Sequence, residues 1–223
     1  MQQRDIIDFF DRLAPRWDAE MIRNDRKIAR ILDACGIREG VRVLDVACGT
    51  GVLFPDYLAR HVRSVTGVDI SPEMINRAGE NFTDSRISLV LADIQQAVFS
   101  EPFDCCMVYN AFPHFPDPDA LLHALSRSIL PGGRVAIAHG MGQGAINAHH
   151  SGAASNVSIA LMDADALAAL MERHGFHADT VVSEEGIYIV AGQRDASFNG
   201  LSNPSARTES PRARRTPDWK TAD

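Results

Sequence analysis

Apolar and polar residues follow two alternating patterns along this chain. Short β-branched runs without a polar face alternate with longer segments whose apolar residues recur about every three or four positions. The first pattern is typical of strands buried in a parallel sheet, and the second of amphipathic helices. Strands that alternate with helices predict an α/β fold with helices on both faces of the sheet. The predicted strands are residues 41–46, 64–69, 87–91, 103–109 and 135–139.

Helices are predicted before and between these strands. An amphipathic helix over residues 3–14 should end at Pro15, and a second over 25–35 should end at Gly36. Further helices are expected after the first strand, after Ser71, after Pro118 and over 163–174. Two runs near the C-terminus, 179–183 and 187–191, are joined by a short polar turn and predict an antiparallel hairpin.

The chain length favours one domain. A chain of 223 residues can build one sizeable core but is short for two, so residues 1–194 are expected to form a single domain. Within it, residues 140–162 are a connection longer than the fold needs, which predicts a functional loop on the substrate side. Residues 195–223 are rich in Ser, Pro, Arg and Asn, and this composition predicts a disordered tail.

Composition narrows the classes of partner. The formal net charge of −7 argues against a broad surface for nucleic acid or anionic membrane. No apolar run approaches the ~20 residues of a membrane span, and the N-terminus lacks a signal pattern. The cysteines have no paired spacing and are expected to be reduced, buried thiols. The sequence therefore predicts a cytoplasmic protein, monomer or homodimer, that acts on a small molecule.

The first strand runs directly into a glycine turn, and the whole stretch is VRVLDVACGTG at 41–51. Gly49 and Gly51 allow positive φ and a close approach of a ligand to the backbone. The helix that follows points its free N–H groups at that ligand, which predicts a nucleotide-type site. A dinucleotide fingerprint needs a third glycine where Phe54 stands, so NAD(P) is disfavoured.

Residues Asp45 to Gly51 resemble the first motif of the class I S-adenosylmethionine-dependent methyltransferases, a D-x-x-C/A-G-x-G turn, and the similarity spans roughly residues 9–192. The resemblance implies a Rossmann-like, doubly wound, mostly parallel seven-stranded sheet closed by an antiparallel C-terminal hairpin. It also implies that S-adenosylmethionine is the cofactor and that its methyl group passes to a small-molecule acceptor, leaving S-adenosylhomocysteine. The accepting atom, whether O, C, N, S or a metalloid, stays open.

Carboxylates follow the second and third predicted strands. Asp69 ends the second strand at the ligand-binding edge, where it can accept both ribose hydroxyls; a helix cap is the alternative, although Ser71 is better placed for that role. By resemblance Asp93 accepts from the adenine amino group, although such an Asp can also be a turn residue. The predicted cofactor-binding residues are Trp17, Asp45, Ala47, Gly49, Gly51, Asp69, Ile70, Met74, Asp93, Ile94 and Asn110.

The N-terminal stretch from Phe10 to Asp18 resembles the F-D-x-x-A-x-x-W-D segment that folds over the cofactor in many small-molecule methyltransferases. An amphipathic helix packed on the sheet explains the same residues equally well, and both interpretations can hold. Residues 1–23 are accordingly expected to form a cover helix.

Histidines gather on the predicted acceptor side. His114 follows the fourth strand, His139 ends the fifth, and His149 lies in the 140–162 connection. Imidazole can act as a base, a donor or a metal ligand, which makes these three the catalytic candidates. Surface histidines in a Gly- and Ala-rich loop are the competing explanation. No helical H-x-x-x-H spacing supports a metal site, so the metal question stays open.

Three function classes remain from the sequence. A methyltransferase comes first, because a sulfonium methyl group is already activated and positioning alone can supply about 7–11 kcal/mol of the barrier. An NAD(P)-linked oxidoreductase on a Rossmann fold is second. The third is a protein that binds S-adenosylmethionine without catalysis.

Overall fold

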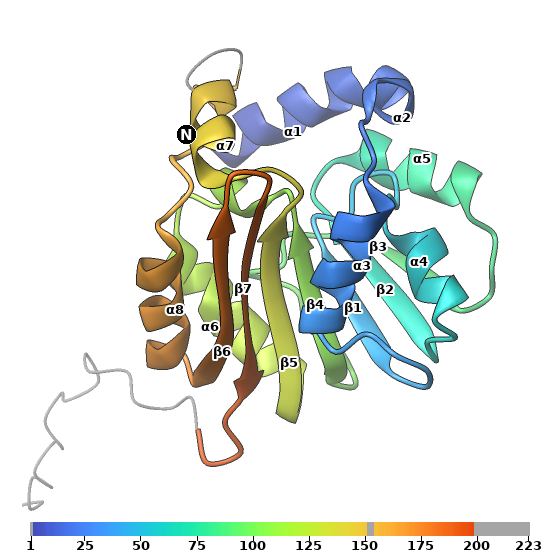
Figure 1. Ribbon diagram of the computed structural model, residues 1–223. Coiled ribbons are helices and arrows are strands. Elements are labelled where there is room, and N and C mark those ends of the chain that lie inside the picture. The colour runs from blue at the N-terminus through green and yellow to red at the C-terminus, as the bar shows by residue number, and fades with distance from the viewer. Residues whose placement is uncertain (1, 151–153, 199–223) are drawn as a thin grey trace, which may run out of the picture.

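A seven-stranded sheet lies at the centre of the structure, a computed structural model that describes residues 2–150 and 154–198 (Figure 1). The strand order is β3-β2-β1-β4-β5-β7-β6; β1 to β5 are parallel, and β7 runs antiparallel to both of its neighbours. This arrangement confirms the predicted fold class. The strands are β1 Arg42–Val46, β2 Ser64–Asp69, β3 Ile87–Leu91, β4 Phe103–Tyr109, β5 Ile129–His139, β6 Phe176–Glu184 and β7 Ile187–Arg194.

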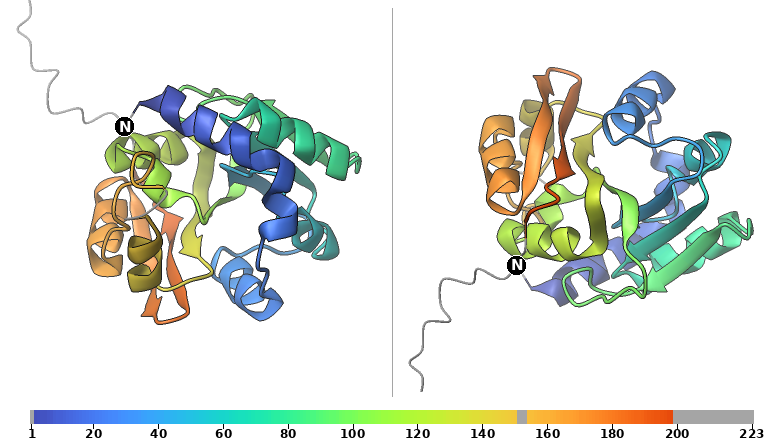
Figure 2. Two further views of the ribbon diagram at one scale, coloured as in Figure 1. Left: turned by 90° about the horizontal axis from the view of Figure 1, so that it is seen from above. Right: turned by 90° about the horizontal axis from the view of Figure 1, so that it is seen from below.

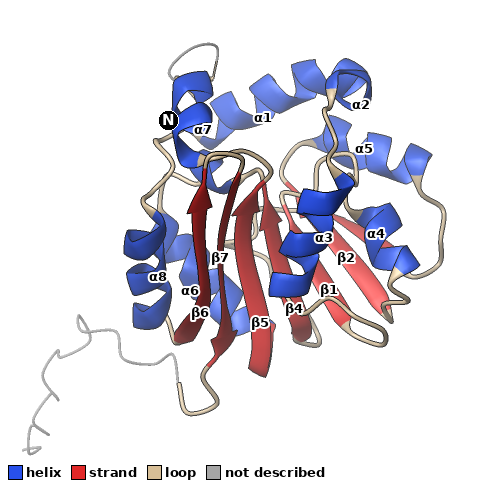
Figure 3. Ribbon diagram, in the orientation of Figure 1, coloured by secondary structure: helices blue, strands red, loops and turns tan. Residues whose placement is uncertain are grey.

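Helices cover both faces of the sheet (Figure 3). One apolar cluster packs α3, α4 and α5 on one face, and a second packs α6 and α8 on the other. The bounds of these helices are α3 Asp25–Ala34, α4 Phe54–Ala59, α5 Pro72–Asn81, α6 Pro118–Ser128 and α8 Ala164–Arg173. The inner parallel strands β1, β2 and β4 are thus largely buried on both sides, whereas the edge strand β3 is partly exposed.

The N-terminal segment crosses the end of the sheet where the parallel strands finish (Figure 2). Helix α1 spans Gln3–Leu13, and the chain continues through the 3₁₀ turn η1, Ala14–Arg16, into the short helix α2, Trp17–Glu20. The first helix ends at Leu13, close to Pro15 as predicted. Pro15 then lies in the first turn of η1, where its missing N–H removes no helical hydrogen bond.

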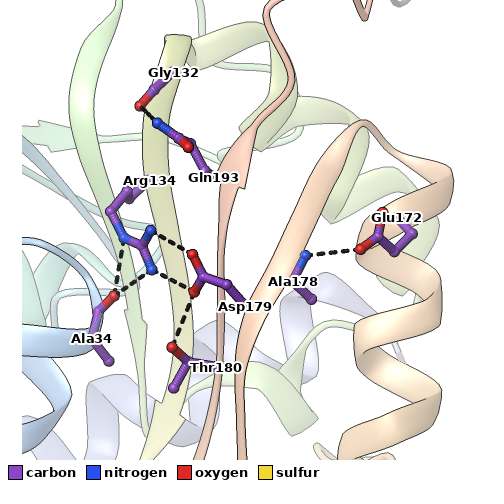
Figure 4. Close-up of polar contacts among 8 residues, drawn as sticks. All are labelled: Ala34, Gly132, Arg134, Glu172, Ala178, Asp179, Thr180 and Gln193. Carbon is purple, nitrogen blue, oxygen red and sulfur yellow. Dashed lines mark hydrogen bonds and ion pairs between the residues drawn. The ribbon is translucent and has the colours of Figure 1, made fainter.

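Arg134 on β5 ties α3 to β6 across the intervening strand β7 (Figure 4). Its two Nη atoms donate to the Asp179 carboxylate at 2.8 and 2.7 Å, and its Nε and Nη2 donate to the carbonyl of Ala34 at 3.1 and 3.0 Å. A Cβ on Gly36 would lie 2.8 Å from Arg134 Cδ, and Gly36 has φ +75°, so both sterics and backbone favour glycine there. This bidentate pair fixes the hairpin on the rest of the sheet.

The predicted loop at 140–162 is wrong in one part, because it contains helix α7, Gln143–His150. Its Gly140, Gly142 and Gly144 suggested a loop, yet Gly142 is required by packing: a Cβ there would lie 2.3 Å from the Glu185 carbonyl oxygen. Ile146 anchors the helix in the core. Strand β5 also begins earlier than predicted, at Ile129.

Within the described residues, no helix combines the length and the apolar character that crossing a membrane requires. Most of the tail predicted to be disordered, residues 199–223, lies outside the described part of the chain.

Candidate functional site

The glycine turn after β1 holds three residues in the left-handed region of backbone space. Ala47, Gly49 and Gly51 have φ values of 54°, 55° and 88°. A Cβ on Gly51 would lie 2.6 Å from Phe54 Cδ2, so this glycine is required by its neighbours. A Cβ on Gly49 would meet nothing closer than Trp17 Nε1 and Met74 Sδ, both at 4.0 Å. The space next to Gly49 is therefore open to a ligand, and Trp17 lies on the same side of the turn.

Asp69 at the end of β2 lies under this turn and is 8% exposed. Its Oδ2 accepts from the Gly49 N–H at 2.9 Å, and its Oδ1 accepts from the Ser71 N–H at 2.9 Å. Burial raises the pKa of the Asp69 carboxyl, while the donated N–H groups of Ser71 and Gly49 oppose that rise. Asp69 thus joins the glycine turn to the start of α5, where Ser71 is the N-cap as expected.

A cavity of about 140 Å³ opens where β1, β2 and β4 end. Asp69 and the glycine turn line one part of it, and His114 lines another. Most of the predicted cofactor residues lie on this wall: Trp17, Ala47, Gly49, Asp69, Ile70, Met74, Ile94 and Asn110. Asp45, Gly51 and Asp93 are not among the described residues that line it. Their roles toward a cofactor stay predictions.

Asp45 is buried in β1 and is 2% exposed. Burial raises the pKa of its carboxyl to about 8; the Tyr57 hydroxyl opposes that rise, and the negative charge of Asp69 adds to it. Across the described residues, Asp45 Oδ2 has no hydrogen-bond partner.

Two side-chain hydrogen bonds hold the N-terminal segment on the strand-end turns. Asp18 Oδ1 accepts from Thr50 Oγ1 in the glycine turn at 2.5 Å. Asp11 Oδ1 accepts from Ser71 Oγ, at the start of α5, also at 2.5 Å. The segment packs on the strand-end turns and lines the cavity, and its role as a cover over the cofactor stays a prediction.

A third contact reaches the end of β3. Gln3 Nε2 donates to Asp93 Oδ2 at 3.0 Å, while Asp93 Oδ1 accepts from the N–H of Gln95 at 2.9 Å. Asp93 thus stabilises its own turn and also binds Gln3 at the start of α1. An adenine amino group at this carboxylate would share it with Gln3.

His114 stands on η2, Phe112–His114, directly after β4. Its Nδ1 lies 2.8 Å from the Val157 carbonyl oxygen, and its ring contacts Phe10 edge-to-face with centroids 4.8 Å apart. His139 is 2% exposed, lies edge-to-face on Tyr188 at 5.9 Å between centroids, and is not among the described cavity-lining residues. The structure therefore brings only His114 to the described cavity wall. His149 belongs to α7, but its side chain lies outside what the structure describes.

Part of the chain is similar to known methyltransferases. A family model described as a methyltransferase domain matches residues 43–133. The ubiquinone biosynthesis O-methyltransferase of Alkalilimnicola ehrlichii is 31% identical over 137 residues, which cover 56% of this chain and 55% of that protein. The chain is therefore similar to class I S-adenosylmethionine-dependent methyltransferases over this matched part. It spans about half the length of the curated relatives it matches.

Solved structures agree on the fold of this methyltransferase. A chain of the complex between the Haloferax volcanii Trm112 methyltransferase activator and a methyltransferase superposes with a TM-score of 0.72 at 18% identity, covering 83% of this chain and 97% of that one. Phosphoethanolamine N-methyltransferase 2 of Haemonchus contortus, solved with S-adenosylmethionine, gives 0.62 at 25% identity, covering 77% and 44%. The NAD(P)-linked alternative is not favoured.

S-adenosylmethionine is the cofactor of this methyltransferase family, and the residues present fit it. The open space above Gly49 admits a ligand against the backbone, and the buried Asp69 carboxylate offers the acceptor that a ribose diol needs. Ile70, Met74 and Ile94 supply an apolar wall on the same side. Within the described residues, no cluster of His, Cys, Asp or Glu could hold a metal ion.

Sequence reasoning missed two polar side chains on the cavity wall of the methyltransferase, Arg23 and Tyr109. Arg23 Nη2 donates to both Asp56 carboxylate oxygens at 2.6 Å, and its Nε donates to Asp25 at 2.7 Å. Burial raises the pKa of the Tyr109 hydroxyl, which keeps it protonated. Tyr109 ends β4, so the strand-end argument could have found it. Arg23 lies between two helices, where no pattern marks it.

Proposed function

We propose that this methyltransferase transfers the methyl group of S-adenosylmethionine to a small-molecule acceptor and releases S-adenosylhomocysteine. The observation that carries the proposal is that the Asp69 carboxylate and the His114 ring line one cavity. Asp69 lies at the end of the cavity that would bind the methyl donor, S-adenosylmethionine. His114 lies at the other end, where the methyl acceptor would bind. The active site would therefore be closed by α1 and α2, with the transferred group between these two residues.

The donor end would hold S-adenosylmethionine through Asp69 and the glycine turn. Asp69 would accept from the ribose hydroxyls while it keeps its two backbone donors, because a carboxylate has about four lone-pair sites. Ile70, Met74 and Ile94 would flank the adenine. Asp93 would accept from the adenine amino group, Ala47 and Asn110 would border the methionine part, and Trp17 would cover it.

The acceptor end would orient a nucleophile in line with the methyl carbon. This chemistry needs no covalent enzyme nucleophile, so orientation is the main task of the protein. The curated relatives that match are named O-methyltransferases, which makes oxygen the first accepting atom to test. The net charge of −7 supports a small-molecule partner rather than nucleic acid. A cytoplasmic enzyme, monomer or homodimer, is consistent with this role.

A methyl-transfer screen across phenols, quinones, thiols, amines and metalloid anions tests the proposal, with S-adenosylhomocysteine as the readout. We expect release of S-adenosylhomocysteine that depends on one acceptor class and falls at least tenfold in an Asp69→Asn variant at limiting cofactor. An Asp33→Asn variant, on the exposed side of α3, is the matched control. Tight binding of S-adenosylmethionine without turnover of any acceptor would favour the non-catalytic binding protein instead.

A further inference from the structure

A second cavity, of about 250 Å³, lies at the end of the sheet opposite to the glycine turn; we call it the distal cavity. It opens where β4 and β5 begin and β7 ends, beside the last turn of α6 (Figure 2). The connection from β3 to β4 forms another part of its wall. Among the described residues, the distal cavity shares no lining residue with the cavity of the proposed function.

Two arginines give the distal cavity its positive charge. Arg127 lies in the last turn of α6, and Arg194 ends β7. Glu101 is the carboxylate on the described wall, and its Oε2 is paired with Arg42 Nη1 at 2.5 Å. Within the described part of the chain, no salt bridge involves Arg127 or Arg194. The wall therefore carries two positive charges that no described carboxylate neutralises.

The Arg194 guanidinium is fixed by one hydrogen bond and has donors to spare. Its Nη1 donates to the Ile129 carbonyl, at the start of β5. Its Nε is buried and has no hydrogen-bond partner among the described residues. A charged group that is partly withdrawn from water in this way attracts an opposite charge more strongly than an exposed one does. Arg194 is thus suited to bind an anion that enters the distal cavity.

Arg127 can turn toward the same anion. Its Nη2 lies 3.4 Å from the Gln95 carbonyl oxygen, a long distance for a hydrogen bond. The side chain is otherwise exposed, so little is lost when it changes partner. The two guanidinium groups can therefore share one anion.

Apolar side chains form most of the remaining wall. Val98 is 87% exposed, and Pro102 and Pro131 lie on the same wall. Phe99 packs edge-to-face on Phe103 with ring centroids 5.1 Å apart, which holds the β3–β4 connection in place. A ligand with an apolar body would remove the exposed Val98 side chain from water.

The donors on this wall favour a carboxylate over a phosphate. A phosphate group presents three strong acceptor oxygens, whereas the described side-chain donors are the two guanidinium groups and one hydroxyl. That hydroxyl, Ser128 Oγ, already donates to the Ala124 carbonyl at 2.9 Å. A carboxylate has two oxygens, which two guanidinium groups can satisfy.

We propose that the distal cavity binds a small organic carboxylate, with its charge at Arg127 and Arg194 and its apolar body on Val98. The site goes beyond the proposed function, because it lies at the opposite end of the parallel strands and no step of methyl transfer uses it. Binding is non-covalent and needs no co-reactant.

Two probes with the same body test the role of the charge. 3-Phenylpropionate carries a carboxylate, and 3-phenylpropanamide carries a neutral amide in its place. Each is titrated into the full chain without S-adenosylmethionine, and nitrogen-15 spectra follow the Arg194 Nε–H and the Val98 backbone N–H. We expect both signals to shift to saturation with the acid, with a dissociation constant of about 1 mM for a ligand of this size, and not with the amide. Acetate and inorganic phosphate should bind at least about tenfold more weakly, because neither has an apolar body.

Substitutions locate the site. Arg127→Gln and Arg194→Gln should each weaken 3-phenylpropionate binding by about tenfold or more, the usual loss for one hydrogen bond to a charged group. Val98→Ser should weaken binding by a smaller factor. Arg26→Gln, an exposed arginine of α3 that lies far along the chain from this wall, is the matched control and should bind as the wild type does. Circular dichroism shows which variants fold; if Arg194→Gln does not, the exposed Arg127 decides the result.

Several results would overturn the inference. The first is equal binding of the acid and the amide, or no saturable shift with the acid. The second is unchanged affinity in a folded Arg127→Gln variant. Phosphate that binds as tightly as 3-phenylpropionate would show that the arginines attract any anion, and shifts confined to Asp69 and the glycine turn would place the acid in the other cavity. Because S-adenosylmethionine is absent throughout, none of these results decides the proposed function.

Discussion

Replacing Asp45 by Asn should change how stability depends on pH. The carboxyl is 2% exposed and its pKa is raised to about 8, whereas an Asp in an unfolded chain has a pKa of about 3.9. Between these values the folded chain keeps a proton that the unfolded chain releases. The unfolded state therefore binds fewer protons, and the free energy of unfolding falls as the pH rises through this window.

The magnitude follows from the two pKa values. Each pH unit between about 4 and 8 should cost about 1.4 kcal/mol, which accumulates to about 4 kcal/mol at pH 7. Asn has nearly the same shape and carries no charge, so the variant escapes this loss. The stability of Asp45→Asn minus that of the wild type should grow steadily from pH 5 to about pH 8 and then level off.

Urea unfolding followed by tryptophan fluorescence at several pH values measures this difference. Other groups titrate in both proteins, so their contributions cancel when the two curves are subtracted. A difference that stays constant with pH would mean that Asp45 has the same pKa folded and unfolded. A difference that shrinks as the pH rises would mean that its folded pKa is lowered, and the account of its burial would be refuted.

Three further predictions concern the hairpin, the glycine turn and the N-terminal segment. Arg134→Ala should destabilise the fold by about 1–3 kcal/mol in urea unfolding, the range for hydrogen bonds to charged groups, without changing cofactor affinity. The loss should become smaller in acid, where Asp179 is neutral and only the bonds to Ala34 remain; a loss of unchanged size would show that the ion pair contributes nothing. Gly51→Ala should lower the melting temperature more than Gly49→Ala, because a Cβ at position 51 would lie 2.6 Å from Phe54. Gly49→Ala should instead mainly weaken S-adenosylmethionine binding, measured by calorimetry. A larger loss of melting temperature in Gly49→Ala than in Gly51→Ala would contradict the geometry of the turn. Hydrogen exchange in α1 and α2 should slow when S-adenosylmethionine is added, and equal exchange would leave the segment as a packed helix only.

The sequence predicted the parallel sheet well because the inner strands β1, β2 and β4 are mostly buried and carry short runs rich in apolar residues. It also placed Asp69, since the end of a parallel strand at a ligand edge is a position that spacing alone defines. His139 was harder. It ends β5 as predicted, but side chains alternate across a strand, and its ring lies on Tyr188 rather than on the cavity wall.

Other features could not be predicted because they depend on contacts between distant residues. Asp18 and Thr50 meet only after the chain has folded, and nothing local marks the pair. Arg23 lies in a short connection and acquires its place on the cavity wall through Asp56 on α4. Helix α7 was not predicted because glycines surround its start, yet one of them, Gly142, is required by packing against Glu185.

Calorimetric titration of S-adenosylmethionine into the wild-type chain and an Asp69→Asn variant tests the central claim most directly. Circular dichroism should first show that the variant is folded, because Asp69 also accepts from the Gly49 and Ser71 N–H groups. We expect one site per chain in the wild type and a loss of about 1.5–3 kcal/mol of binding free energy in the variant, roughly 10- to 150-fold in affinity. Unchanged affinity in a folded variant, or binding of NAD(P) in place of S-adenosylmethionine, would contradict the assignment of this cavity.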